Sequence, residues 1–323
     1  MESMNNLNDE QIKKYIFEKI EEAMEENGYI SLAEFVDICL FKYAQSYYRA
    51  DRNRTGTNGD FYTNSNLKGN IFARLVEDCA KNFLGKNPSK IVEIGAEPKK
   101  ALFASSQVLP LGAKLKIEGD DILVFSNELL DSRPFDRYVM QNNQWQKTYL
   151  KLENTKIVEF LMPASLQESK FLDKYFIETF DGYTLDFSFD AIKLFEDIVG
   201  QNWTGTLIFI DYFRTTFDLK VFESGTRRRY KNQDVHLDIF SEMGVSDITF
   251  NPHIESLEDI LRKAGFSDIN YTSQEAFLMN NSREVLCDIV ANSSSLSPEK
   301  GALMELLSPA YMGAVFRVLW AKR

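Results

Sequence analysis

The chain has 323 residues, of which 44% are hydrophobic and 13% aromatic, and its formal net charge is −11. This composition predicts a globular protein with a large core, and the excess of acidic residues argues against general binding of nucleic-acid phosphate or anionic lipid. The longest apolar runs are shorter than the about 20 residues of a membrane-spanning helix, and the N-terminus is acidic, so neither a membrane segment nor a transit peptide is expected.

The first part of the chain is predicted to be helical. Over Asp9–Glu25, apolar residues recur every four positions on one helix face, with charged residues elsewhere. Ser31, followed three positions later by Glu34, has the pattern of a capping box and predicts the start of a second helix. A third helix is predicted over Leu67–Leu84.

A polar loop with no hydrophobic period, residues 47–66, separates the second and third predicted helices. It contains aromatic residues, among them Phe61 and Tyr62. These favour a loop that folds over a site, and a self-packed surface loop is the alternative.

Two short runs rich in Ile and Val, Ile91–Ile94 and Ile122–Phe125, predict strands that are buried on both faces. In an open α/β sheet, ligands bind at the carboxyl ends of the strands, so the polar residues around these two ends are expected to line a shared crevice. They are Glu93, Gly95 and Glu97 at the first strand and Asn127, Glu128 and Asp131 at the second.

The remaining elements complete an α/β fold with an insertion. Short alternating runs over Phe135–Pro163, broken at two Asn-containing turns, predict a meander of antiparallel strands. Downstream we expect two helices and two strands: Phe189–Val199, Leu257–Ala264, Leu207–Ile210 and Ala314–Trp320.

The cysteines and histidines do not form a recognisable catalytic or metal-binding pattern. Cys39, Cys79 and Cys287 stand singly in apolar surroundings, so we expect reduced thiols and a cytoplasmic location. His236 and His253 are too isolated for a metal site, and hydrolase motifs are missing from the sequence.

Nine segments occur in a distinctive order: YISLAEFVD (29–37), NGDFYTN (58–64), IVEIG (91–95), NELLDSRPF (127–135), IFIDYF (208–213), GTRRRY (225–230), SDITFNPH (246–253), SQEAFL (273–278) and YMGAVFRVL (311–319). In this order they resemble the MidA-like family of S-adenosylmethionine-dependent methyltransferases. The mitochondrial members of that family methylate an arginine of a respiratory complex I subunit. The resemblance extends over nearly the whole chain.

The resemblance implies a Rossmann-like core of seven strands behind a helical N-terminal part. We therefore expect a division into residues 1–85 and 86–323, with the insertion at about 135–185 in the second part. It also implies S-adenosyl-L-methionine as the cofactor and a protein side chain, arginine, as the methyl acceptor. A protein partner is expected, and neither nucleic acid nor membrane.

Two departures from the family concern the cofactor site. The family has a glycine-rich turn of the type GPGRGT, whereas here Gly95 is followed by AEPKK, in which a Cβ and a fixed proline φ obstruct close approach of the backbone to a ligand. Residues 96–121 leave room for one crossover, which predicts a truncated first half of the sheet. Glu118, after the strand-like residues 113–117, is the candidate for the acid that holds the cofactor ribose, although 113–117 equally fits a later strand of the family.

Two further departures concern histidines. The family's histidine in its DLTAHVDF-like segment is Asn251 here, and the histidine that follows its TLRGY segment is Gln233.

The candidate catalytic residues are Glu128 and Asp131, because a carboxylate can orient and polarise the guanidinium of an arginine acceptor. At positions i and i+3 after a strand, both can face one crevice. The alternative is that Asn127 and Asp131 cap a turn while Glu128 is solvated.

The candidate cofactor-binding residues are Glu93, Gly95, Glu118 and Asn127, together with Asp60, Phe61, Tyr62 and Thr63 of the loop that faces the cofactor in the family. Glu93 lies inside an apolar strand, where a charge must be paired, so a core ion pair is the alternative to a site role. Asp211 either serves the site or caps a turn. Arg227–Arg229 are expected to be solvated or paired with neighbouring acids.

Two functions of different classes remain open. The first is an active methyltransferase, and the second is a methyltransferase-like scaffold that no longer binds the cofactor and acts through protein association.

Overall fold

The computed structural model describes residues 7–50, 52, 54–56, 59–60, 62–67, 70–96, 100–110, 112–177, 179–292, 294 and 297–323. The chain forms two compact units that alternate along the sequence. The meander unit comprises Met1–Tyr62, Asp131–Ala191 and Arg214–His253, and the sheet unit comprises Thr63–Leu130, Ile192–Phe213 and Ile254–Arg323. The predicted division into residues 1–85 and 86–323 stays a prediction.

The sheet unit is built on six strands in the order β13-β14-β9-β4-β2-β3. The strands β3, β2, β4 and β9 are mutually parallel, and β14 runs antiparallel to both of its neighbours. This arrangement confirms the predicted α/β fold with a Rossmann-like core. The strands are β2 (Lys90–Ile94), β3 (Gln107–Leu109), β4 (Gly119–Asn127), β9 (Trp203–Asp211), β13 (Ser267–Ser273) and β14 (Arg317–Lys322).

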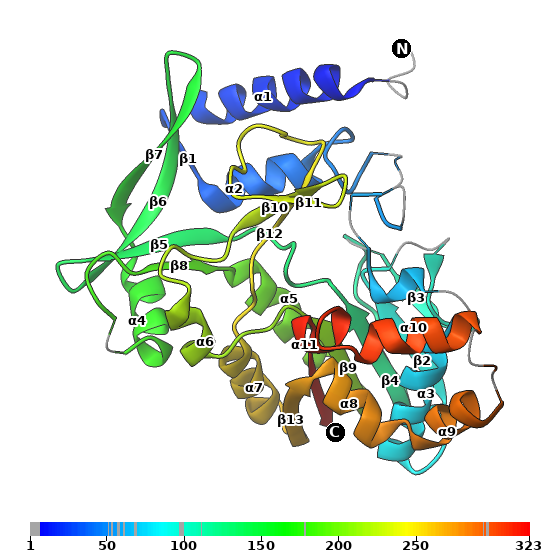
Figure 1. Ribbon diagram of the computed structural model, residues 1–323. Helices are drawn as coiled ribbons and strands as arrows, with labels where there is room; N and C mark the ends of the chain where they lie inside the picture. The colour runs from blue at the N-terminus through cyan, green and yellow to red at the C-terminus, as the bar shows by residue number, and fades with distance from the viewer. Residues whose placement is uncertain are drawn as a thin grey trace. The chain divides into compact units, whose positions relative to one another are not determined.

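Helices cover both faces of this sheet, which explains why its central strands are continuous apolar runs. On one face, Phe72 of α3 packs edge-to-face on Phe125 of β4, and on the other, Phe195 of α5 packs on Phe209 of β9. The helices α3, α8, α9 and α10 contact one another beside the sheet (Figure 1). The helices are α3 (Ile71–Leu84), α5 (Phe189–Val199), α7 (Ile254–Lys263), α8 (Gln274–Asn281), α9 (Arg283–Asn292), α10 (Pro298–Leu307) and α11 (Met312–Val315).

The meander unit combines the N-terminal helices with two antiparallel sheets. One sheet has the order β1-β6-β5-β8 with β7 paired to β6, and the other has the order β11-β10-β12. Its helical elements are α1 (Asp9–Glu25), α2 (Leu32–Asp37), the π-helix Ile38–Lys42, α4 (Leu166–Tyr175) and α6 (Thr216–Val221). Its strands are β1 (Ile30–Ser31), β5 (Asp136–Gln141), β6 (Gln144–Glu153), β7 (Lys156–Pro163), β8 (Thr184–Phe187), β10 (Arg228–Lys231), β11 (Asp234–His236) and β12 (Asp247–Thr249).

The predicted meander and its turns are confirmed. The turn between β5 and β6 places Asn142 and Asn143 at φ of 50° and 58°, and the turn between β6 and β7 places Asn154 and Thr155 at 50° and 65°. Asparagine tolerates this left-handed backbone better than most residues, so the Asn-containing breaks in the sequence mark the hairpins.

Three predicted elements differ from the structure. Residues 113–117 are not a strand: Lys114 and Lys116 are exposed while Ile117 is buried, so the alternation reflects burial of one side without a paired strand. The helix predicted over Leu67–Leu84 begins at Ile71, after Asn70 in a left-handed conformation. The strand predicted over Ala314–Trp320 is the end of α11 followed by β14.

The half of the sheet beyond β2 is short, as the sequence predicts. The three-residue strand β3 pairs with β2 and ends that side of the sheet. In the part of the chain that the structure describes, the sheet therefore has six strands, where the family implies seven.

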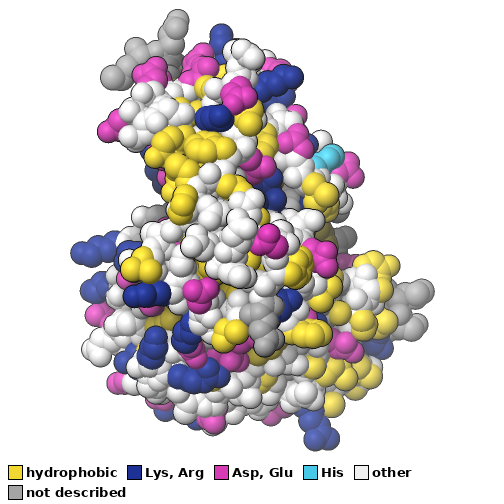
Figure 2. All heavy atoms as spheres, turned by 90° about the vertical axis from the view of Figure 1, so that its left-hand side faces the viewer, with side chains coloured by type: hydrophobic (Ala, Val, Ile, Leu, Met, Phe, Trp, Pro, Cys, Tyr) yellow, Lys and Arg dark blue, Asp and Glu magenta, His cyan; other side chains and the backbone are white. Residues whose placement is uncertain are grey.

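Within the described part of the chain, none of the helices is both long enough and apolar enough to span a membrane. On the face drawn in Figure 2, Lys and Arg side chains are interspersed with Asp and Glu side chains. The net charge of −11 is thus not gathered into one acidic patch on that face.

A buried carboxyl group gives the meander unit a predicted pH dependence. Burial raises the pKa of Asp247 to about 7 from an ordinary value of 3.8; the Tyr48 hydroxyl donates to Asp247 at 2.9 Å, and Asp60 and Arg228 are the other charged neighbours. A raised pKa means that the folded state holds a proton that the unfolded state has released. Proton binding by Asp247 therefore stabilises the folded state. The stabilisation that it contributes is complete below about pH 4 and is lost as the pH rises through about 7.

We therefore expect the Asp247→Asn variant to become progressively more stable than the wild type as the pH increases. The difference in the free energy of unfolding should grow by about 1.4 kcal/mol per pH unit between about pH 4 and 7. Urea unfolding at a series of pH values measures it. Two parallel stability curves would contradict the expectation.

Candidate active site

The predicted crevice residues lie on the same rim of the sheet. Strands β2 and β4 are parallel neighbours, with Ile94 opposite Ser126, and the Ser126 hydroxyl donates to the carbonyl of Ile94 at 3.3 Å. Strand β9 is the next neighbour, with Asn127 opposite Ile210. The backbone that leaves β2 at Gly95 is therefore adjacent to the turn that leaves β4 at Asn127, as the sequence predicts.

Gly95 has a conformation that favours glycine. Its φ is 87°, and its N–H donates to the carbonyl of Leu109 at 2.9 Å. A Cβ at this position would lie 2.8 Å from the Cδ1 of Leu129. Both the backbone angle and the close approach of the turn after β4 thus oppose a larger residue. Glu97 and Pro98 lie outside the described residues.

The carboxylate of Glu93 anchors the segment that follows β2. Its two oxygens accept from the Leu102 N–H at 2.9 and 3.1 Å, and one of them accepts from the Ser106 hydroxyl at 3.2 Å. Burial raises the pKa of Glu93. Its partners are hydrogen-bond donors of the neighbouring chain, and the core ion pair considered from the sequence is not present among the described residues.

The turn after β4 holds Glu128 in an unusual backbone conformation. Its φ is 53°, which is costly for a residue other than glycine and occurs preferentially at functional sites. The Asn127 side-chain amide donates to the Glu128 carboxylate at 2.7 Å, and the Glu128 N–H donates to the carbonyl of Ile210 at 2.9 Å. The half-buried carboxylate is thus oriented by its neighbour and by β9.

Asp211, at the end of β9, holds the turn that follows β4 through hydrogen bonds to its backbone. One oxygen of its buried carboxylate accepts from the N–H groups of Leu129 and Leu130 at 3.2 and 2.9 Å. The other oxygen accepts from the N–H of Tyr212 at 2.7 Å. Of the two roles considered from the sequence, these bonds match the capping role, and the turn that Asp211 caps carries Glu128.

Two buried residues of this rim were not singled out from the sequence. The Asn64 amide donates to the Asn127 side-chain carbonyl at 2.9 Å and to that of Gln274 at 2.8 Å. Both residues lie inside segments by which the chain resembles its family, NGDFYTN and SQEAFL. Membership of these segments is the sequence feature that could have marked them as site residues. Sequence spacing alone could not predict a contact between residues that are 210 positions apart.

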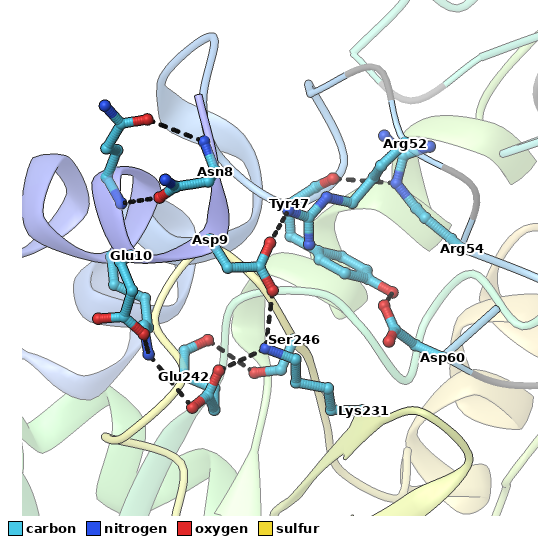
Figure 3. A network of polar contacts seen from close by, with 12 residues as sticks. Asn8, Asp9, Glu10, Tyr47, Arg52, Arg54, Asp60, Lys231, Glu242 and Ser246 are labelled. Atoms are coloured by element: carbon cyan, nitrogen blue, oxygen red, sulfur yellow. Dashed lines mark hydrogen bonds and ion pairs between the residues drawn. The ribbon is translucent and has the colours of Figure 1, made fainter. Parts of the chain in front are cut away.

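The loop residues predicted to bind the cofactor are spread over the two units. Asp60 belongs to the meander unit, where it accepts from the Tyr47 hydroxyl at 2.7 Å (Figure 3). It also accepts from the Asn232 N–H at 3.0 Å. Phe61 lies outside the described residues, and Tyr62 is half-buried. Thr63 caps the short helix Asn64–Asn66 in the sheet unit.

The last two predicted residues are Asp131 and Glu118. Asp131 is buried at the start of the second stretch of the meander unit, and its backbone carbonyl accepts from the Phe250 N–H at 3.0 Å. Glu118 is exposed just before β4, at the opposite rim, and pairs with Lys116 at 3.2 Å. The residue that follows β3 is Pro110.

The arginines of the GTRRRY segment are paired in the meander unit. Arg227 forms an ion pair with Glu159, and Arg229 donates to the carbonyl of Asp238 at 2.6 Å. Arg228 donates to the side-chain carbonyl of Asn251 at 2.7 Å, at the position where the family has a histidine. The Arg227 contact agrees with the predicted pairing with a neighbouring acid, whereas the contacts of Arg228 and Arg229 described here are to an amide oxygen and a backbone carbonyl.

A family model described as "Putative S-adenosyl-L-methionine-dependent methyltransferase" matches residues 77–272, more than half of the chain. The chain belongs to this methyltransferase family. The resemblance inferred from the nine segments is thereby confirmed at the level of the family. A search among curated proteins finds no match.

Two solved structures are similar to this methyltransferase-family chain over almost its whole length. A COG1565 superfamily member from Burkholderia thailandensis, bound to S-adenosyl-homocysteine, has a TM-score of 0.81 and 22% identity, covering 98% of this chain and 92% of its own. A native structure of a COG1565 superfamily protein from the same organism has a TM-score of 0.78 and 21% identity, with the same coverage. At this level of identity the likeness establishes the fold.

Proposed function

We propose that this protein transfers a methyl group from S-adenosylmethionine to a protein side chain, with arginine as the acceptor. The observation that carries the proposal is the position of Gly95 beside Asn127 and Glu128, on the rim of a Rossmann-like sheet where ligands of such sheets bind. Family membership supplies the reaction class.

The residues of the rim fit the cofactor. Gly95, with a φ of 87°, makes the tight turn that nucleotide-binding sheets of this kind have after their first strand, and Asn127 lies at the end of the neighbouring strand. When bound, S-adenosylmethionine supplies an electrophilic methyl group. The similar structure that contains S-adenosyl-homocysteine supports binding here.

Glu128 is the residue proposed to orient the acceptor. A carboxylate can accept two parallel N–H groups of a guanidinium, which aligns one nitrogen and favours its loss of a proton as the new bond forms. Asn127 and the Asp211-capped turn hold this carboxylate in place. Asp131 as a second carboxylate, and Asp60, Phe61, Tyr62 and Thr63 as cofactor contacts, remain part of the proposal. Glu118 is not, because it lies at the opposite rim.

The Glu128→Gln variant tests the arginine proposal. With tritiated S-adenosylmethionine and a Gly-Arg-rich peptide as acceptor, kcat should fall about 10²-fold, because an amide presents one acceptor and one donor to the guanidinium. Affinity for S-adenosyl-homocysteine should stay within about twofold, since Glu128 faces the acceptor. Calorimetry and filter-binding assays measure the two quantities.

Glu118→Gln is the matched control, because it makes the same change at the opposite rim and should leave kcat unchanged. A peptide in which lysine replaces every arginine should accept no methyl group. Equal labelling of the lysine peptide would refute arginine as the acceptor.

A methyltransferase-like scaffold is the second candidate function. It is favoured by the loss of glycines after Gly95, and by the position of Glu118, the one candidate for the acid that holds the cofactor ribose, at the opposite rim. Failure of the wild type to bind S-adenosyl-homocysteine would favour this scaffold. A cytoplasmic location, inferred from the scattered cysteines, belongs to both proposals.

A further inference from the structure

Three amide side chains form a continuous hydrogen-bonded path to Glu128 inside the sheet unit. Gln274, at the start of α8, and Asn64 form a reciprocal pair: the Asn64 amide donates to the Gln274 oxygen at 2.8 Å, and the Gln274 amide donates to the Asn64 oxygen at 3.1 Å. Asn64 then donates to Asn127 at 2.9 Å, and Asn127 donates to Glu128 at 2.7 Å. Both Asn64 and Gln274 are 0% exposed.

The two ends of this amide path determine its direction. At one end the Gln274 amide also donates to the backbone carbonyl of Leu306 at 3.2 Å, and a carbonyl can only accept. At the other end an ionised Glu128 can likewise only accept. Gln274 must therefore keep its NH₂ group toward Leu306, which leaves its oxygen for Asn64.

The same count fixes the orientation of Asn127. The Asn64 NH₂ group uses both of its protons, one on Gln274 and one on Asn127. The Asn127 oxygen is thereby occupied as an acceptor, and its NH₂ group is directed to Glu128. A flip of any one amide would bring two donors or two acceptors together in a buried place, which is costly.

We propose that Gln274 and Asn64 are positioning residues, which fix the direction of the Asn127 amide and so keep its N–H group on the Glu128 carboxylate. Only one part of this inference rests on the proposed function, namely that the oriented Glu128 serves methyl transfer. The hydrogen-bond direction itself is a property of the ligand-free protein. The segments that carry the path are three of those by which the chain resembles its family, NGDFYTN, NELLDSRPF and SQEAFL.

Side-chain amide exchange in the ligand-free wild type is the first test. By NMR, the side-chain amide protons of Asn64 and Gln274 should exchange with water at least about tenfold more slowly than those of the exposed Asn143, because each is hydrogen-bonded and buried. Exchange as fast as at Asn143 would overturn the proposal without any variant having to fold.

The second test replaces Asn64 by aspartate, which has the same shape but no N–H groups. In Asn64→Asp the Asn127 oxygen loses its donor, so the Asn127 amide protons should exchange at least about tenfold faster than in the wild type. Asn82→Asp is the matched control, because it removes one amide hydrogen bond from an exposed position of α3. Unchanged exchange at Asn127 in Asn64→Asp would overturn the proposal.

Kinetics separate this inference from the proposed function. In Asn64→Asp, kcat for the Gly-Arg-rich peptide should fall at least about tenfold, while affinity for S-adenosyl-homocysteine stays within about twofold. A wild type that transfers no methyl group would refute the proposed function, and amide exchange would still decide the hydrogen-bond path. An active wild type with an equally active Asn64→Asp variant would refute the positioning role alone.

Discussion

Replacement of Gly95 by valine is expected to abolish the thermal stabilisation that S-adenosyl-homocysteine gives to the wild type. At a ligand concentration of about 100 times Kd, bound ligand adds about 2.7 kcal/mol, which corresponds to a rise in Tm of about 4 °C for a chain of this size. The valine side chain would occupy the space beside Leu129, because even a Cβ lies 2.8 Å from its Cδ1. Displacement of Leu129 would shift the turn that carries Asn127 and Glu128, beside which the ligand is proposed to bind. Differential scanning fluorimetry measures the shift.

The control for this prediction is Gly265→Val. Gly265, at the end of α7, has a φ of 81° against 87° for Gly95, and a Cβ there would meet no atom within 4 Å. Both variants therefore carry the backbone strain of a β-branched residue at positive φ, and their Tm values without ligand should fall. Only Gly265→Val should keep the ligand-induced rise. A rise retained in Gly95→Val would remove Gly95 from the cofactor site.

Replacement of Arg137 by methionine is expected to destabilise the meander unit by about 3–5 kcal/mol. The guanidinium of Arg137 forms two parallel hydrogen bonds with Asp186, at 2.8 and 2.9 Å, and the Asp186 side chain is 0% exposed. Without Arg137, the donors that remain for the buried carboxylate in the described part of the chain are the Thr226 and Arg227 N–H groups. Chemical denaturation at pH 7 measures the change in the free energy of unfolding.

Arg262→Met is the control for this ion pair. Arg262 pairs with Glu258 and Asp259 on the surface of α7, where its side chain is 55% exposed, so its replacement should change the stability by less than about 1 kcal/mol. A similar decrease in the free energy of unfolding in both variants would contradict the expectation that burial makes the Arg137–Asp186 pair more stabilising than an exposed one.

The parts of the site that the sequence predicts are those set by strand pairing. Ile91–Ile94 and Ile122–Phe125 are apolar runs long enough to mark buried strands, and adjacent parallel strands bring their carboxyl ends together. The positions of Gly95, Asn127 and Glu128 on one rim follow from that rule. The backbone angle of Glu128 does not, because it depends on Asp211 and Ile210 of a strand that lies about eighty residues downstream.

The remaining parts depend on contacts that no local pattern encodes. Glu118 follows a segment of alternating apolar and polar residues that forms no strand, so its place before β4 could not be distinguished from the end of a strand. The amide path from Gln274 to Asn127 joins three segments that are distant in the sequence. The one sequence feature that these segments share is that all three belong to the resemblance to the family. The two units interleave along the chain, and composition carries no signal for that.

The most direct test of the central claim is a calorimetric titration of the wild-type protein with S-adenosyl-homocysteine. We expect saturable heat with one site per chain. Absence of saturable heat up to about millimolar ligand would contradict it, because a cofactor site that weak could not support methyl transfer at ordinary cofactor concentrations.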